Sequence, residues 1–224
     1  RADTVVSVYV SESFLEKPEH EKCLQGYRYE VVSDAVFREI SDTQTPQGIL
    51  AIVRMPKYDL PDLLQGDHTH LLILESVQDP GNLGTMVRTG EGAGITGIIM
   101  NKTTVDLFNP KTIRSTMGSI YRVPYLITEH LPDLLDELHK ENIRLYAAHL
   151  KGDTYYDVFD FTGACGFLIG NEGNGLSDEI AECADCYLKI PMEGKVESLN
   201  AAVSAALLMY ECKRQRGEHN ENMV

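Results

Sequence analysis

The sequence predicts an α/β protein in which a medium-sized unit with a parallel sheet follows a smaller α/β unit. From residue 67 onward, short runs of apolar residues alternate with stretches of helical periodicity. Continuous apolar strands are typical of parallel sheets, because helices cover both faces of such a sheet. The chain has 224 residues, of which 43% are hydrophobic, and this composition is that of a globular protein with a buried core.

The first unit, residues 1–56, reads as strand, strand, helix, strand. β-Branched residues dominate its strands, and a Ser-Asp pair precedes the helix as a capping signal. The expected elements are strands at residues 5–10, 27–32 and 49–53 and a short helix after that pair, with Val36, Phe37 and Ile40 on one side. Prolines and polar residues predict a linker at residues 57–66. Because the chain begins with Arg1 rather than Met, we expect the start of this unit to be missing.

The second unit, residues 67–224, contains six apolar runs that predict strands. Leucines at 131, 134, 135 and 138 follow the i, i+3, i+4, i+7 spacing of an amphipathic helix. Strong helix formers at residues 201–214 predict a final helix. The strands are expected at residues 71–74, 97–100, 125–127, 145–148, 167–169 and 187–190.

The charge of the chain is strongly acidic, which is unusual for a nucleic-acid-binding protein. The formal net charge is −14. Residues 82–124 nevertheless hold five basic and two acidic side chains, a local charge of +3. Because binding depends on the field over the contact patch, this segment is a candidate surface for a polyanion, and a chance cluster on a solvated face is the alternative.

Three further features limit the class of protein. No apolar run is long enough to cross a bilayer, so we expect no membrane association. Five scattered cysteines favour reduced thiols and a cytoplasmic location. The CxxC at residues 183–186 has no second pair to complete a zinc site, so we expect no metal.

The segment GAGITG, residues 92–97, matches the glycine pattern of dinucleotide-binding loops. Such a loop follows a strand and begins a helix. Here the predicted order is helix, glycines, strand, and no acidic residue stands about twenty positions further on. A nicotinamide-dependent oxidoreductase is therefore disfavoured.

Three polar, glycine-bearing motifs come near the ends of predicted strands. They are NLGTMVR at residues 82–88, GNEGNGL at residues 170–176 and IPMEGKVESLN at residues 190–200. Ligands of α/β sheets bind at the carboxyl ends of the strands, so we expect one shared site. Glycines leave backbone amides uncovered and permit positive φ, as a loop around a ligand requires. The alternative for any single motif is an ordinary tight turn with polar caps.

Within these motifs, particular side chains have the positions of a reaction centre. Arg88 follows Asn82 by six residues, about one and a half helical turns, and is expected to reach back over the sheet edge. Glu172 is the sole carboxylate in its loop. Either Ser198 or Asn200 is expected to cap the final helix.

Taken together and in this order, the motifs resemble the SpoU (TrmH-like) family of the SPOUT RNA 2′-O-ribose methyltransferases, over roughly residues 45–214. The resemblance implies a SPOUT-type parallel sheet with a C-terminal trefoil knot that holds S-adenosylmethionine. It implies methyl transfer to a ribose 2′-hydroxyl of RNA, a homodimer, and an RNA substrate-binding role for residues 1–56. One departure is Gly90, which stands where the family usually has Ala.

The resemblance also assigns roles, residue by residue. Gly170, Ile190 and Leu199 would line the cofactor, with Met192 and Gly194 nearby. Asn82, Arg88, Glu172, Ser198 and Asn200 match the family's catalytic and RNA-handling positions.

The identity of the general base stays open at this point. The family proposal gives that role to Arg88, yet arginine is effectively always protonated in proteins. Its alternative role is to clamp a substrate phosphate through two parallel hydrogen bonds. Glu172 would then accept the proton, or it would anchor Asn82 or Asn200.

Four functions compete. The first is 2′-O-methylation of ribosomal RNA, favoured over the second, the same reaction on transfer RNA, by the additional N-terminal unit. The third is a non-catalytic protein that binds RNA or S-adenosylmethionine, and the fourth is the oxidoreductase. The third is disfavoured because the residues matched to catalysis are all present.

Overall fold

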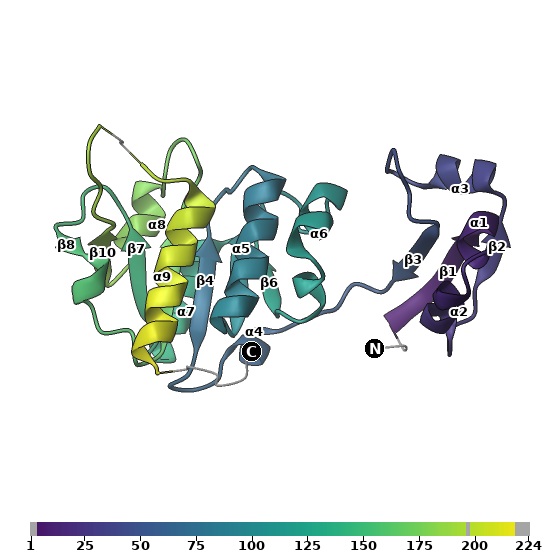
Figure 1. Ribbon diagram of the computed structural model, residues 1–224. Helices are drawn as coiled ribbons and strands as arrows, with labels where there is room; N and C mark the ends of the chain where they lie inside the picture. Colours follow the sequence, from purple (N-terminus) through teal and green to yellow (C-terminus); the bar gives the residue numbers. More distant parts are fainter. Residues whose placement is uncertain (1–3, 196–197, 218–224) are drawn as a thin grey trace. The chain divides into compact units, whose positions relative to one another are not determined.

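The computed structural model describes residues 4–195 and 198–217. The chain divides into two units, Arg1–Lys57 and Tyr58–Val224 (Figure 1). Each unit has its own hydrophobic core.

The first unit is a small sheet with three helices. Strand β1 (Val5–Ser11) pairs in parallel with β2 (Glu30–Val32) and antiparallel with β3 (Ile49–Val53). Helices α1 (Glu12–Leu15), α2 (Pro18–Leu24) and α3 (Asp34–Ile40) connect them. The core consists of Val8, Val10, Phe14 and Leu24.

Two of these helices were not predicted from the sequence. Ser11 caps α1 through its side chain, and Pro18 begins α2. Both helices have at most seven residues, too few for a helical period to stand out. The strand expected from residue 27 begins only at Glu30.

The second unit is a parallel sheet covered on both faces. Among the described residues, seven strands form one sheet in the order β6-β5-β4-β9-β7-β10-β8, and all of its pairings are parallel. The strands are β4 (His70–Leu74), β5 (Gly97–Asn101), β6 (Tyr125–Thr128), β7 (Arg144–Ala148), β8 (Thr154–Tyr155), β9 (Cys165–Ile169) and β10 (Cys186–Lys189). All six predicted strands are therefore present, and β8 is an addition.

The sheet divides the core of this unit into two layers, and helices cover each of them. On one face, α5 (Pro80–Ala93) and α9 (Ala201–Gln215) lie side by side over the central strands (Figure 1). The other face is covered by α4 (Leu60–Leu63), α7 (Leu131–Lys140) and α8 (Asp178–Glu182). The remaining helical segments are α6 (Pro110–Thr116), η2 (Ser119–Tyr121) and η3 (Tyr156–Val158).

The segment expected to be a linker contains helix α4. Asp59 and Asp62 form a capping box at its start, and Leu63 is fully buried. The side chain of Leu63 fills the space beside Gly97, where a Cβ atom would lie 2.3 Å from it. Residues 58–66 are therefore packed with the second unit rather than extended between the two.

Candidate active site

A cavity of about 460 Å³ lies at the carboxyl edge of the sheet. The loops that follow β7, β9 and β10 surround it, together with the start of α9. This volume is within the range of small-molecule and cofactor sites. The lining residues fall into four segments, residues 148–151, 169–176, 188–192 and 198–204, with gaps in the last two.

The loop after β9 folds back on itself around Gly170. Asn171 and Gly175 exchange backbone hydrogen bonds of 3.0 and 2.9 Å. A Cβ atom on Gly170 would lie 2.1 Å from the carbonyl carbon of Gly175, so no other residue fits there. The side chain of Asn171 accepts hydrogen bonds from the amides of Gly173 and Asn174. These contacts give the cavity a wall made largely of backbone.

Glu172 ties this loop to the start of α5. Its carboxylate accepts hydrogen bonds of 3.0 Å from the backbone amides of Gln78 and Asp79 and from Nδ2 of Asn82. Burial favours the neutral acid, but these hydrogen bonds outweigh it and hold the pKa of Glu172 below its usual value. The carboxylate is therefore ionised at neutral pH, and both of its oxygens accept hydrogen bonds.

Asn200 connects the third motif to the other two. Its Nδ2 donates a 3.0 Å hydrogen bond to Oδ1 of Asn82, while its Oδ1 accepts from the amides of Ala202 and Val203 at the start of α9. Asn200, not Ser198, is thus the cap of α9. A chain of hydrogen bonds runs from Asn200 through Asn82 to Glu172, so the structure brings one residue of each motif together.

The residues expected to hold the cofactor are placed mostly around the cavity. Gly170, Ile190, Met192 and Leu199 line it, and so do Glu172 and Ser198. Gly194 does not line it; this glycine has a φ of 76° in the loop between β10 and α9. The functional role of each residue stays a prediction.

Arg88 is not part of this constellation. Six residues of α-helix advance the side-chain direction by about 240°, so Arg88 and Asn82 leave α5 on different faces. Arg88 comes one helical turn after Gly84, which packs closely against α6. A Cβ atom on Gly84 would lie 2.4 Å from the Cβ atom of Ser115. Arg88 therefore lies on the side of α5 that is near α6. Arg88 is exposed and lines neither described cavity. The expected reach of Arg88 over its own sheet edge is absent from this arrangement.

The basic segment is partly neutralised by ion pairs. Lys102 pairs with Glu129, Lys111 with Asp79, and Arg122 with Glu91. Among the residues that the structure describes, Arg88 and Arg114 are the members of the segment without an ion pair. They stand on neighbouring helices, α5 and α6.

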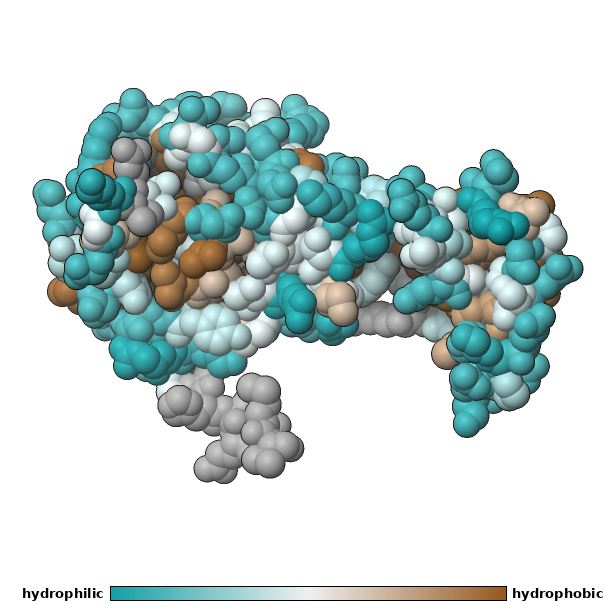
Figure 2. Space-filling model, turned by 45° about the horizontal axis from the view of Figure 1, so that its top comes forward, coloured by the Kyte–Doolittle hydropathy of each residue, from teal (hydrophilic) through white to brown (hydrophobic). Residues whose placement is uncertain are grey.

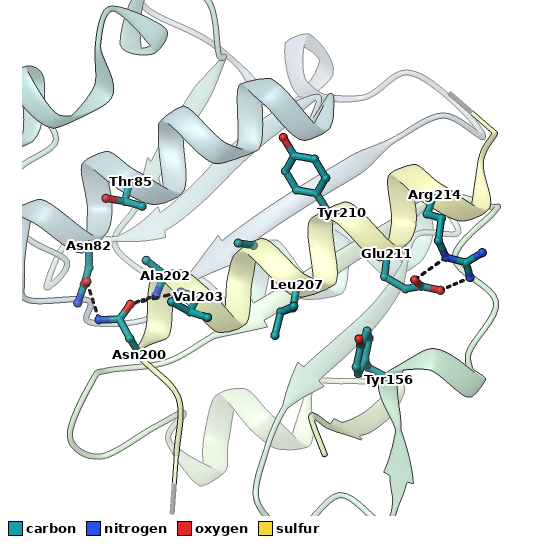
Figure 3. A pocket seen from close by; sticks show the side chains of 11 residues that line it. Asn82, Thr85, Tyr156, Asn200, Ala202, Val203, Leu207, Tyr210, Glu211 and Arg214 are labelled. Carbon is teal, nitrogen blue, oxygen red and sulfur yellow. Dashed lines mark hydrogen bonds and ion pairs between the residues drawn. The ribbon is translucent and has the colours of Figure 1, made fainter. Parts of the chain in front are cut away.

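A second, more open hollow of about 550 Å³ lies along α9. Figure 2 shows apolar side chains gathered over this helix, and among the residues of the hollow Val203, Leu207 and Tyr210 are 48%, 36% and 49% exposed. The side chains of Asn82 and Asn200 point toward one another at its end (Figure 3). The asparagine pair lines this hollow but not the cavity at the sheet edge, to which Asn82 is joined by its hydrogen bond to Glu172.

Several residues near the cavity were not predicted from the sequence. His149, Leu150 and Lys151 form one wall, and Lys151 pairs with Asp178. Their position directly after a predicted strand was the available signal.

Neither a membrane span nor a metal cluster is present in the described part of the chain. None of its helices is long and apolar enough to cross a membrane. Residues 4–195 and 198–217 contain no group of three metal-binding side chains. Cys183 donates to the carbonyl of Glu179, and Cys186 accepts from Arg144, so the CxxC cysteines have separate partners.

Comparison with known families decides the identity. The SpoU rRNA Methylase family matches residues 69–210, which is more than half of the chain. The chain belongs to this family. A second family, described as RNA 2′-O ribose methyltransferase substrate binding, matches residues 1–59. The chain is an enzyme of the SpoU methylases, which use S-adenosylmethionine.

Two characterised relatives are similar over most of the chain. The 23S rRNA (guanosine(2553)-2′-O)-methyltransferase RlmP of Bacillus subtilis is 36% identical over 84% of this chain and 73% of its own length. The 23S rRNA (guanosine-2′-O-)-methyltransferase RlmB of Xylella fastidiosa is 34% identical over 74% of this chain and 68% of its own length.

Solved structures confirm the predicted SPOUT-type α/β fold class. The SpoU methyltransferase AviRb of Streptomyces viridochromogenes, in complex with AdoMet, superposes with a TM-score of 0.87 at 27% identity, covering 96% of this chain and 84% of that one. The A. aeolicus TrmH/SpoU tRNA modifying enzyme has a TM-score of 0.61 at 26% identity and covers 70% of this chain and 79% of that one.

Proposed function

We propose that this protein transfers a methyl group from S-adenosylmethionine to a ribose 2′-hydroxyl of ribosomal RNA. The observation that carries the proposal is the cavity at the carboxyl edge of the sheet, bounded by two of the three family motifs. The hydrogen-bonded chain from Asn200 through Asn82 to Glu172 connects the third motif to it.

The residues around the cavity fit the cofactor. S-adenosylmethionine supplies an electrophilic methyl group on a positively charged sulfur. Gly170, Ile190, Met192 and Leu199 would hold it, with the backbone groups of the loop after β9 as hydrogen-bonding partners. The ionised Glu172 adds a negative charge in the same wall, which suits a cationic ligand.

Glu172 serves this site as an anchor rather than as the general base. Three hydrogen-bond donors already occupy its oxygens, and its lowered pKa makes it a weaker proton acceptor. It orients Asn82, which in turn orients Asn200.

Arg88 reaches the reaction through a homodimer. The apolar strip Val203, Leu207 and Tyr210 on α9 supplies a docking surface next to Asn82 and Asn200. A second copy bound there buries the strip and completes each site with Arg88 of the partner subunit. In this position the guanidinium clamps an RNA phosphate next to the reacting ribose.

Ribosomal RNA is favoured over transfer RNA as the substrate, because the solved rRNA methyltransferases match a larger share of this chain than the tRNA modifying enzyme does. Solved relatives titled rRNA methyltransferase cover 94% of this chain, whereas the A. aeolicus tRNA modifying enzyme covers 70%. The difference is about the size of the first unit, which has the family match for substrate binding. A cytoplasmic location fits this substrate and the five free cysteines.

A trefoil knot at the C-terminus is part of the same proposal. Its support is the way the chain after β9 returns to the sheet: β10 lies between β7 and β8, and α9 packs beside α5. Arg216, just after α9, donates to the carbonyls of His68 and Thr69 before β4. These bonds fasten the last helix to the beginning of the unit.

Methylation of isolated RNA tests the function. Purified protein is incubated with labelled S-adenosylmethionine and either ribosomal or transfer RNA, and the label is mapped by mass spectrometry after nuclease digestion. We expect a 2′-O-methylated nucleotide in ribosomal RNA that is missing from a deletion strain. Label in transfer RNA alone would support the second function, and cofactor binding without transfer to any cellular RNA would support the non-catalytic one.

A further inference from the structure

Glu75 makes a two-point contact with Ser177 that the proposed reaction does not use. The carboxylate of Glu75 accepts hydrogen bonds from the amide and the hydroxyl of Ser177, at 2.7 and 2.6 Å. Glu75 follows β4 directly, and Ser177 follows the loop of residues 170–176 that walls the cavity. Neither residue lines the cavity itself. The contact therefore fixes one end of the cavity wall from outside.

The same short segment holds the wall at two further points. Nδ2 of Asn171 donates to the carbonyl of Ser76 at 2.9 Å. Glu172 accepts from the amides of Gln78 and Asp79. The wall is thus attached to residues 75–79 near its start and again at its end, next to the buried Leu176.

Residues 75–79 are themselves held from the opposite side. The amide of Ser76 donates to Asn101 at 2.9 Å, and its hydroxyl lies 2.6 Å from that of Thr103, at the end of β5. Ser76 has a φ of 56°, an uncommon value for a residue other than glycine. Gln78 bridges the carbonyls of Ser76 and Thr103. The segment is consequently a fixed support.

We propose that Glu75 is a positioning residue for S-adenosylmethionine, acting through Ser177, a role that rests on the proposed function of the cavity. Both ends of the wall are held in the free protein, so the cofactor does not have to order them on binding. Without the Glu75 contact, the downstream end of the loop is released and the binding-competent conformation becomes a minor one. The apparent dissociation constant of S-adenosylmethionine is then the intrinsic constant divided by the fraction of molecules in the binding-competent conformation.

Two substitutions break the contact in different ways. Glu75→Gln keeps the size of the side chain but replaces one acceptor oxygen with a donor nitrogen. Ser177 also caps α8 through the amide of Ile180. Ser177→Asp preserves the cap, because aspartate is an equally good N-cap, but it sets a second carboxylate against Glu75. Ser177→Thr retains both the cap and the hydroxyl and is the conservative variant.

The experiment measures cofactor binding and turnover on the full chain. Calorimetric titration with S-adenosylmethionine and with its demethylated product gives dissociation constants. For a competent fraction of about one tenth, Glu75→Gln and Ser177→Asp raise both constants about tenfold. The kcat at saturating cofactor stays within about twofold of wild type, since the reacting groups are untouched. Ser177→Thr binds like wild type, as does the control Glu129→Gln, an exposed carboxylate bonded to Lys102.

The outcomes separate this inference from the proposed function. If the wild-type chain binds no S-adenosylmethionine, the proposed function fails. If the wild type binds and Glu75→Gln binds equally well, the role of Glu75 is overturned. A fall in kcat with an unchanged dissociation constant would overturn it too. Loss of folding in both Glu75→Gln and Ser177→Asp would assign the pair a structural role instead.

Discussion

Glu172 accepts three hydrogen bonds although it lies on an exposed loop. Its negative charge therefore contributes to the stability of the second unit through these three donors. Two of the donors are backbone amides at the start of α5, where the helix dipole also favours a negative charge. The third is the side chain of Asn82. A neutral amide in place of the carboxylate cannot accept from all three, because one of its two polar atoms is itself a donor.

We therefore expect Glu172→Gln to destabilise the second unit in a pH-dependent manner. The folded-state pKa of Glu172 lies below its ordinary value of 4.5, so its stabilisation is present above that value and is lost as the pH falls through the folded-state pKa. The deficit of the variant at pH 7 is about 1 kcal/mol or less, because solvent screens the exposed carboxylate. Thermal melts at pH 7 and pH 3 measure it.

The matched control is Glu137→Gln on α7, an exposed carboxylate without a side-chain partner among the described residues. It should melt like wild type at both pH values. A deficit of Glu172→Gln that stays constant between pH 7 and pH 3 would show that shape, not charge, is what the substitution removes.

Arg88, unlike Asn82, Glu172 and Asn200, makes no hydrogen bond to another predicted catalytic residue in the described part of the chain. Arg88→Ala leaves the cavity intact, so the dissociation constant of S-adenosylmethionine should change little. Turnover should fall by ~10²-fold or more, because a group that orients the substrate is lost. Arg88→Lys should recover little, since lysine lacks the planar pair of donors. Calorimetry measures the dissociation constant of S-adenosylmethionine, and single-turnover assays measure the rate of methyl transfer.

Arg114→Ala is the control for general electrostatic attraction. It removes the other unpaired guanidinium of the basic segment, on α6. If both arginines only attract RNA, the two Ala variants should lose similar activity and recover it at low salt. A defect confined to Arg88 that persists at low salt would indicate a specific phosphate contact.

At the scale of elements, the loop after β9 depends on the close approach of Gly170 to the backbone of Gly175. Gly170→Ala would place a Cβ atom 2.1 Å from the backbone of Gly175, which the loop cannot accommodate without opening. We expect this variant to lose detectable cofactor binding in calorimetry while its sheet still forms. Gly163→Ala is the matched control, because a Cβ there meets nothing within 4 Å. Wild-type affinity in Gly170→Ala would show that the loop does not form the cofactor wall.

Helix α5 shows why a family departure can be harmless. Glycine in a helix costs ~1 kcal/mol relative to alanine. Here, however, a Cβ on Gly90 would lie 2.3 Å from the Cδ1 atom of Ile95, so the Ile95 side chain occupies the space that alanine would need. Burial of Ile95, which is 8% exposed, offsets the propensity cost.

The elements that the sequence predicted are those with a strong periodic signal. Apolar runs identified all six major strands of the second unit, and leucine spacing identified α7. The short helices α1, α2, α4, α6 and α8 were missed, because helices of four to seven residues show too little periodicity and depend on caps such as the Asp59–Asp62 box.

At the scale of the whole molecule, strand order and side-chain direction set the limit of sequence reasoning. The motifs predicted one shared site, and the structure does join Asn82, Glu172 and Asn200 by hydrogen bonds. The adjacency of β4 and β9 that permits this is long-range and leaves no local pattern. The spacing of Arg88 from Asn82 predicts its distance along α5, whereas its rotation about the helix axis directs it to a different face from Asn82.

Because the apolar strip on α9 is exposed, we predict that the protein forms a homodimer in solution. Sedimentation should give about twice the chain mass of 25.0 kDa. Leu207→Arg should produce a monomer, because it places a charge in the centre of the strip next to Tyr210. That monomer should still bind S-adenosylmethionine, since Leu207 does not line the cofactor cavity, yet it should not methylate RNA.

Mixed dimers test whether the two protomers share their sites. Arg88→Ala and Asn200→Ala homodimers should each be nearly inactive. In a heterodimer of the two, one site combines an intact Asn200 with the intact Arg88 of the partner subunit, and the other site lacks both. After random subunit exchange, half of the dimers are mixed and each has one working site, so activity should return to about one quarter of wild type. If each protomer used its own Arg88, every site would carry one defect, and the mixture would stay as inactive as its parents.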